Sequence, residues 1–232
     1  MHGLGNDYVY IDCFQEHNAA LIAQVDLPTL ARRVSDRHLG IGSDGLVLIL
    51  PSKEADVKMR IFNADGSEAQ MCGNAARCIA KYVYESGLCG REMTLETLSG
   101  IKRLIVDPQD GLVTVVMGSS IGNPHKVFIT EEPVAQIELY GIEDTNVEWV
   151  NVLNRREIRM RVWERGSGET LACGTGACAA AVTAMDKGLT DNEVTVHLRG
   201  GDLLIRRDEQ GVIFMTGPAS EVFRGEYTWE EE

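Results

Sequence analysis

One short motif occurs twice in this 232-residue chain, and this repeat constrains the fold more than any other feature. Residues 67–80 and residues 168–180 both contain the pattern Glu-x3-Cys-Gly, which places cysteines at Cys72 and Cys173, 101 residues apart. In both copies, small residues, a second cysteine and a helical pattern follow. A spacing of about half the chain is what a duplicated domain produces. The sequence therefore predicts two similar halves, each with one Cys-Gly turn that opens a helix.

Short runs of β-branched and aromatic residues, separated by Gly, Asp and Asn, dominate the rest of the chain. They predict strands at residues 8–12, 45–50, 57–63, 93–97, 101–106, 112–117, 127–130, 147–153, 157–164, 193–198, 202–207 and 212–216. Helical patterns are few, at residues 27–35, 73–85 and 174–187. Many strands with few helices indicate an α+β fold with mixed or antiparallel sheets, rather than a doubly wound parallel sheet.

The repeat also predicts where the chain divides. We expect residues 1–117 together with residues 219–232 to form an N-terminal domain that contains Cys72. Residues 118–218 form the C-terminal domain that contains Cys173. The stretch after Thr216 lies beyond the strands of the second half, so it is free to return to the first.

Composition argues against several classes of protein. The chain has 35 acidic and 22 basic residues and a formal net charge of −13, a field that repels phosphate backbones, so we expect no nucleic-acid partner. It has no run of 18 apolar residues, so we expect no transmembrane helix and no membrane partner. The first residues have neither the basic nor the apolar stretch of a secretory signal, which favours the cytoplasm.

The chain has six cysteines, at positions 13, 72, 78, 89, 173 and 178. In a chain of this length without an export signal they are expected to be free thiols. Their spacings lack the Cys-x2-Cys pairs of zinc sites and of thiol redox motifs, so no metal is expected. An isolated free cysteine is most often a core residue. The repeated Cys-Gly context singles out Cys72 and Cys173, whereas the other four are expected to pack in the core.

Two Cys-Gly turns that open helices favour acid–base chemistry at carbon. The unpaired N–H groups and the dipole of a helix N-terminus lower the pKa of a thiol placed there, and they also bind carboxylates. Gly73 and Gly174 let a ligand approach the backbone closely. Two such starts facing each other would hold one carboxylate with a sulfur on each side of its α-carbon. One thiolate would remove the α-proton and the other thiol would return one to the opposite face.

The chain resembles the diaminopimelate epimerase family through motifs that run almost end to end in the family's order. The motifs are residues 3–7, 40–45, 60–67, 71–74, 122–125, 146–148, 163–166 and 172–176. The resemblance implies two pseudo-symmetric domains, each a mixed, mostly antiparallel sheet wrapped around a central helix. It also implies epimerisation of LL-2,6-diaminopimelate to the meso form without pyridoxal phosphate or metal, in lysine and peptidoglycan precursor biosynthesis, by a homodimer.

The same resemblance implies roles for individual residues. Cys72 and Cys173 would be the two bases, with His125 and Glu164 supporting them. The backbone at Gly73, Asn74, Gly174 and Thr175 would hold the reacting carboxylate. The remaining amino and carboxylate groups would be recognised by Asn6, Asn63, Asn123, Asn146, Glu164 and Arg165. Arginine suits a carboxylate, and asparagine amides serve carboxylate and ammonium alike without adding charge.

Alternatives remain open at this stage. His125 could be a turn histidine, and Glu164 with Arg165 a solvated ion pair. The proline racemase group also uses two cysteines, but its members tend to carry His where this chain has Asn74. A carboxylate-binding relative without activity and a thiol redox protein are further possibilities. Gly45 stands where some members of the epimerase family have Gln, so it receives no substrate role. The segments before Gly122 and before Asn146 are shorter than expected, as in a trimmed member or a sequence that lacks loops.

Overall fold

The computed structural model describes residues 1–119, 124–142 and 144–229. The first half contains β1 (His2–Gly3), β2 (Asn6–Asp7), β3 (Val9–Asp12), α1 (Glu16–Ile22), α2 (Leu27–Ser35), β4 (Gly45–Leu50), β5 (Val57–Asn63), β6 (Glu68–Ala69), α3 (Gly73–Glu85), β7 (Glu92–Thr97), β8 (Gly100–Val106) and β9 (Val113–Gly118). The second half contains β10 (His125–Ile129), the 3-10 helix η1 (Val134–Gln136), β11 (Asn146–Asn154), β12 (Glu157–Glu164), β13 (Gly168–Thr170), α4 (Gly174–Asp186), β14 (Glu193–Leu198), β15 (Gly201–Arg207) and β16 (Ile213–Gly217).

The strand pairing of the first half is repeated in the second. In the first half β3 pairs in parallel with β4, β4 is antiparallel to β5, and β5 pairs in parallel with β7. In the second half β10, β11, β12 and β14 pair in the same way. Antiparallel hairpins β7–β8–β9 and β14–β15–β16 complete the two sets. The predicted duplication is therefore present in the topology as well as in the sequence.

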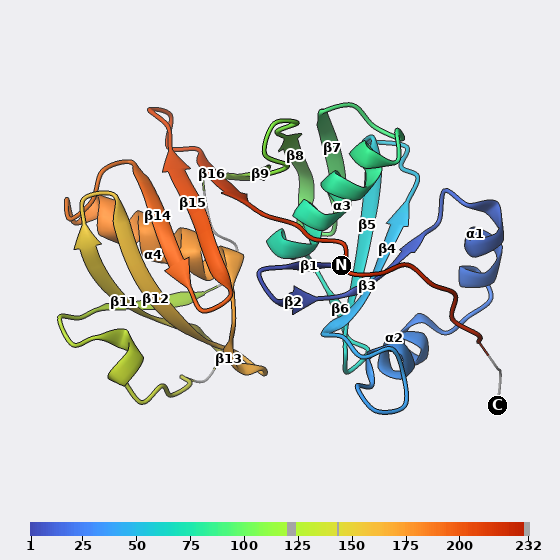
Figure 1. The fold of residues 1–232 in the computed structure, drawn as a ribbon, viewed down its shortest axis with the longest axis horizontal. Helices are drawn as coiled ribbons and strands as arrows, with labels where there is room; N and C mark the ends of the chain where they lie inside the picture. The colour runs from blue at the N-terminus through green and yellow to red at the C-terminus, as the bar shows by residue number, and fades with distance from the viewer. Residues whose placement is uncertain (120–123, 143, 230–232) are drawn as a thin grey trace.

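The two halves join through their last strands. Strand β16 pairs antiparallel with β9, so the strands form one continuous mixed sheet from β10 to β3. In Figure 1 the halves lie side by side with β9 and β16 between them, and each half carries one long helix, α3 or α4. The α+β class predicted from the sequence is confirmed.

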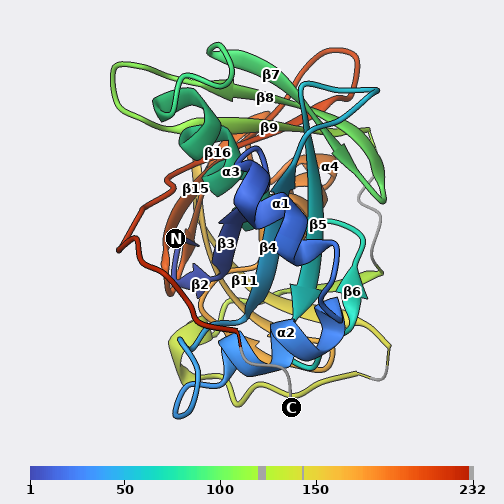
Figure 2. The ribbon, with the colours of Figure 1, turned by 90° about the vertical axis from the view of Figure 1, so that its right-hand side faces the viewer.

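Strand β4 shows why the first half has two layers of helices. Its run Gly-Leu-Val-Leu-Ile-Leu is apolar on both faces. Val47 and Ile49 join the central core that contains α3, whereas Leu46 and Leu48 pack with the buried face of α2. A strand covered on both sides cannot alternate polar and apolar residues. Figure 2 shows α1 and α2 in front of β3, β4 and β5.

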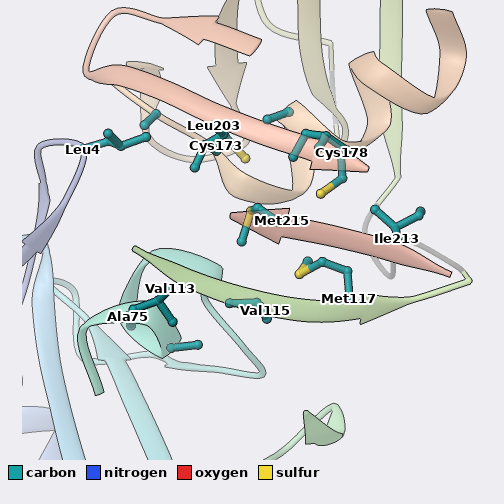
Figure 3. Close-up of a cluster of buried hydrophobic side chains, with 14 of the residues drawn as sticks. Leu4, Ala75, Val113, Val115, Met117, Cys173, Cys178, Leu203, Ile213 and Met215 are labelled. Atoms are coloured by element: carbon teal, nitrogen blue, oxygen red, sulfur yellow. The ribbon is translucent and has the colours of Figure 1, made fainter. Parts of the chain in front are cut away.

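One apolar core extends through both halves. It includes buried residues of α3, of α4 and of the strands around them. At its centre Met215 of β16 lies between the two helices, in the group of side chains that includes Ala75 and Cys173 (Figure 3). The two helices end alike, because Gly87 and Gly188 follow them with positive φ values of 72° and 67°.

After β16 the chain returns to the first half. The backbone of Ser220 exchanges two hydrogen bonds of 2.9 Å with that of His2. Trp229 then packs against the cluster that contains α2, with the guanidinium of Arg33 4.8 Å from its ring centre. Among the described residues, no helix is long and apolar enough to cross a membrane.

The predicted elements agree closely with those observed. Helices α2 and α3 have the predicted bounds, and α4 ends one residue early. The prediction missed α1 and the two- or three-residue strands β1, β2, β6 and β13. These strands are too short to show alternation. Helix α1 has seven residues, none of them buried, and its N-cap Gln15 makes no side-chain capping bond.

Candidate active site

Cys72 and Cys173 occupy the same place in the two halves. Each is the N-cap residue of its helix, with extended backbone (φ −136° and −120°), and each follows a short strand that pairs with β5 or β12. The glycine after each cysteine is the first helical residue. The sulfurs therefore stand beside the free N–H groups of a helix start.

The two helix starts face each other at close range. A Cβ atom added to Gly174 would lie 4.0 Å from the Cα atom of Gly73 and 2.9 Å from the Sδ atom of Met215. A Cβ atom added to Gly73 would lie 2.6 Å from the Cε atom of Met215. From the sequence, these glycines were expected to let a ligand approach the backbone closely. In the structure they also let the two helix starts approach each other and Met215.

Side-chain amides surround Cys72. Its thiol donates to the Oδ1 atom of Asn6 at 3.5 Å, and the Nδ2 group of Asn74 donates to the same oxygen at 3.2 Å. The Nδ2 group of Asn6 donates to Asp44 at 2.8 Å. Asn74 also donates to the backbone oxygen of Ala172 at 3.4 Å, across the boundary between the halves.

A buried arginine orients Asn74. The Nη2 group of Arg77 donates to the Oδ1 atom of Asn74 at 2.8 Å, which leaves the amide N–H groups for Asn6 and Ala172. Arg77 is 0% exposed and also donates to the backbone oxygens of Gly73 and Pro218. Sequence analysis gave this arginine no role. A charged residue within an otherwise small and apolar helix was the signal for it.

Cys173 has a different set of partners. Its sulfur accepts a hydrogen bond from the N–H of Gly176 at 3.3 Å and lies 3.4 Å from the hydroxyl of Thr175. The carboxylate of Glu164, at the end of β12, accepts a 2.5 Å hydrogen bond from Thr170 of β13. Cys173 is buried, at 5% exposure, whereas Cys72 is half-buried.

The sequence predicts that the helix start lowers the pKa of each thiol, and this prediction is wrong for the net shift. Burial raises the pKa of Cys72, and it raises that of Cys173 well above its usual range. Backbone N–H groups of the first helical turn oppose the shift in both. The nearby charge of Glu164 adds to it in both, and burial raises the pKa of Glu164 as well. Loss of water outweighs the helix terminus, so the substrate-free site favours neutral thiols.

His125 opens strand β10 and forms a pair with Glu148 of β11. The Nδ1 atom of His125 lies 2.7 Å from the Oε1 atom of Glu148. Both side chains are buried, at 5% and 0% exposure. The sequence motif at residues 146–148 contains Glu148, but the glutamate received no role. An acidic residue between Val147 and Trp149 in a strand was the available signal.

The other predicted substrate-binding residues lie at strand ends. The Oδ1 atom of Asn146 accepts a 2.9 Å hydrogen bond from the backbone N–H of Arg165, and both residues line one small surface pocket with Pro124 and Asp144. Asn63, at the end of β5, donates to Ser67 at 2.9 Å. Asn123 lies outside the described residues. The structure thus brings Asn6 and Asn74 to Cys72, and Thr175 and Glu164 to Cys173.

Comparison with known proteins identifies close relatives. A family model described as diaminopimelate epimerase matches residues 1–122 and 120–222, two stretches that together span most of the chain. The diaminopimelate epimerase of Pelotomaculum thermopropionicum is 44% identical over 276 residues, with 98% of this chain and 97% of the relative covered. That of Methanococcus maripaludis is 45% identical, with 97% of each covered. The alignments are longer than the 232 residues of the chain, which agrees with the short segments noted in the sequence.

Solved structures share the fold at low sequence identity. A predicted epimerase from Pseudomonas aeruginosa has a TM-score of 0.66 at 17% identity, with 92% of this chain and 90% of that chain covered. A hydroxyproline epimerase from Agrobacterium vitis has a TM-score of 0.58 at 15% identity, with 88% and 77% covered. At such identities the likeness concerns the fold alone.

Proposed function

The chain belongs to the diaminopimelate epimerase family, and we propose that it converts LL-2,6-diaminopimelate to the meso isomer with Cys72 and Cys173 as its two acid–base groups. The observation that carries this proposal is the pair of facing helix starts, each capped by a cysteine and continued by a glycine. The relatives of that name align with this chain over nearly its full length and theirs.

The helix starts supply the binding site for the reacting carboxylate. The first turns of α3 and α4 offer backbone N–H groups that would bind the carboxylate between the two sulfurs. When the α-proton leaves, negative charge spreads onto that carboxylate. Preorganised N–H donors in a buried site stabilise such charge more than water does. The same groups thus bind the substrate and lower the barrier.

The two sulfurs supply the inversion. One sulfur, as thiolate, removes the α-proton, so the C–H bond breaks and an S–H bond forms. The other sulfur, as thiol, gives its proton to the opposite face of the carbon. For the reverse reaction the two sulfurs exchange roles. Burial keeps both sulfurs neutral without substrate, so the thiolate forms when a neighbouring base accepts its proton.

The remaining polar groups recognise the rest of the substrate. Asn6, Asn63, Asn123 and Asn146 would offer amides for its amino and carboxylate groups. The guanidinium of Arg165, beside Asn146 in the surface pocket, would bind the distal carboxylate in a fork. Glu164 would pair with an ammonium group. His125 and Glu164 would support the two cysteines, as the family resemblance implies.

The wider setting is part of the same proposal. The enzyme would act without pyridoxal phosphate or metal, in the cytoplasm, in lysine and peptidoglycan precursor biosynthesis. It would act as a homodimer, with no nucleic-acid or membrane partner. We also propose that residues 1–117 with 219–232, and residues 118–218, are its two domains.

Chiral analysis of LL-diaminopimelate incubated with the purified protein, in buffer free of pyridoxal phosphate, tests the activity. We expect the meso form to appear until the two forms reach equilibrium. L-Proline is the comparison substrate, because the proline racemase group shares the two-cysteine arrangement. Turnover of proline without turnover of diaminopimelate would overturn the proposed substrate.

A further inference from the structure

A buried carboxylate near the start of β11 has no role in the proposed chemistry. Glu148 is 0% exposed and stands between Val147 and Trp149. Its Oε1 atom is bonded to His125, but its Oε2 atom is buried without a hydrogen bond among the described residues. A buried charge is costly unless it is paired. The fold therefore retains this carboxylate at a cost in stability, which indicates a role toward its partner His125.

Glu148 lies against the start of α4. A Cβ atom added to Gly176 would meet the Oε1 atom of Glu148 at 2.7 Å and the Sγ atom of Cys173 at 3.3 Å. The carboxylate and the sulfur thus approach the same residue, whose N–H group also binds that sulfur. A side chain at Gly176 would separate them. The helix dipole favours a carboxylate at this position.

The carboxylate determines which nitrogen of His125 can exchange a proton with the site. A carboxylate bound at Nδ1 holds a proton there, so the neutral ring presents Nε2 as an acceptor. The Nε2 atom is buried and has no hydrogen-bond partner among the described residues. Because Glu148 holds this ring and also approaches Gly176 beside the sulfur of Cys173, a buried acceptor without a partner on the ring is a candidate recipient for the proton of that thiol.

Other ionisable groups surround this pair. Glu164 of β12 is within electrostatic reach of both Glu148 and His125, and it acts on Cys173 and on Cys72. A thiolate at Cys173 therefore has two carboxylates as neighbours. A protonated His125, held by Glu148, would supply a cation beside these carboxylates.

We propose that Glu148 is a positioning residue that holds the Nδ1 proton of His125 and so makes Nε2 the acceptor for the Cys173 proton. The S–H bond of Cys173 breaks, the proton passes to Nε2, and a thiolate and an imidazolium result. The charge of the imidazolium is balanced by Glu148. This inference rests on the proposed function, because the Cys173 thiolate is needed only if Cys173 acts as one of the two acid–base groups.

The histidine tautomer can be measured without any activity. In protein labelled with 15N-histidine, which contains five histidines, loss of one signal in His125→Gln assigns His125. We expect neutral His125 to carry its proton on Nδ1 in the wild type. In Glu148→Gln, which keeps the shape and removes the charge, we expect the Nε2–H form to gain population. An unchanged tautomer in Glu148→Gln would overturn the proposal.

Labelling of the thiols separates positioning from simple repulsion. We expect iodoacetamide to modify Cys173 more slowly in Glu148→Gln and in His125→Gln than in the wild type, with the rate at Cys72 unchanged, as resolved by peptide mass spectrometry. Glu148 acting only as a nearby negative charge would disfavour the thiolate. Its removal would then speed the labelling of Cys173, which would contradict the proposal.

Kinetics give the third readout. We expect Glu148→Gln to lower kcat about 10- to 100-fold with KM nearly unchanged, because a hydrogen bond to a charged group contributes about 1.5–3 kcal/mol. The double variant with His125→Gln should be no slower than His125→Gln alone. Glu96→Gln, a carboxylate paired with Lys58 in the other half, is the control that should retain activity. Additive losses, or lower thermal stability with kcat unchanged, would show a merely structural role.

These measurements can overturn the role of Glu148 and the proposed function independently. A wild-type protein that leaves diaminopimelate unchanged would overturn the function, whereas the tautomer and the labelling rates would still decide the role of Glu148. An active enzyme whose Glu148→Gln variant behaves as wild type in all three would retain the function and lose the positioning residue.

Discussion

The two halves have the same backbone around their cysteines and different side chains behind them. The thiol of Cys72 is bonded to the amide of Asn6, which Asn74 holds in turn, and Asn74 is oriented by the buried cation of Arg77. Cys173 is accompanied by Glu164 and by the pair of His125 and Glu148. One thiol donates to an amide oxygen, whereas the other sulfur accepts from a backbone N–H.

The difference shows which part of a duplicated site the two copies must share. The facing helix starts must match, because both contribute N–H groups to one carboxylate and a sulfur to one carbon. The supporting groups need not match, because the substrate presents different groups to each side. Amides neither take up nor release protons near neutral pH, whereas imidazole does, and burial raises the pKa of the Glu164 carboxyl above its usual range. The imidazole and carboxylates near Cys173 can therefore take part in its proton exchange.

Removal of either sulfur should have the largest effect on the epimerisation rate, because the reaction needs one sulfur from each half. We expect Cys72→Ala and Cys173→Ala each to lower the epimerisation rate by at least about 1,000-fold, since a positioned acid or base contributes about 100- to 10,000-fold. Cys89→Ala, a half-buried cysteine outside the site, is the matched control in the same assay. Full activity in either active-site variant would show that the halves do not act together.

A methyl group at either helix start should separate the halves. We expect Gly73→Ala and Gly174→Ala to lower kcat/KM about 10- to 100-fold and to cost about 1–3 kcal/mol of stability, as overpacking does, because each added Cβ meets Met215. Shortening Met215 to Ala in the same chain should restore part of the activity. Gly90→Ala, where a Cβ meets nothing within 4 Å, is the control. Wild-type kinetics in both variants would contradict the close approach.

Arg77 should matter for stability more than any exposed arginine. We expect Arg77→Met to lower the free energy of unfolding by about 2–4 kcal/mol, because it leaves several buried oxygens without a donor. Denaturation by urea measures the loss. Arg103→Met, which removes an exposed pair with Glu92 on the same half, should cost under about 1 kcal/mol. Equal losses of unfolding free energy in the two variants would show that Arg77 does not support the structure around Cys72.

The second cysteine of α4 gives the smallest effect, through pH. Burial raises the pKa of Cys178 to about 12, so the folded state keeps this proton while the unfolded chain loses it above its ordinary thiol pKa. The contribution of this thiol to the free energy of unfolding therefore keeps its full value below the ordinary thiol pKa. It declines as pH rises from there toward the pKa of Cys178 in the folded state. Between pH 8 and pH 10 we expect Cys178→Ala to lose about 2 kcal/mol less than the wild type. Parallel losses would contradict the pKa.

The sequence predicted most of the fold and the pair of cysteines because both depend on local signals. Alternation predicts strands, and a repeated Cys-Gly turn predicts two equivalent helix starts. The strand pairing that joins β9 to β16 has no local signal, because it depends on contacts between distant segments. The predicted thiol pKa was wrong for the same reason, since burial is a property of the folded molecule. Glu148 and Arg77 were missed because their partners lie 23 and up to 141 residues away in the chain.

The most direct test of the two-sided site is a single early turnover of LL-diaminopimelate in D2O, followed by mass and chiral analysis. We expect the meso product to carry one solvent deuterium at the inverted carbon, while the remaining LL substrate is unlabelled. This follows because one sulfur keeps the original hydrogen and the other delivers deuterium from the opposite side. Meso product that retains its original hydrogen at the inverted carbon would contradict the account.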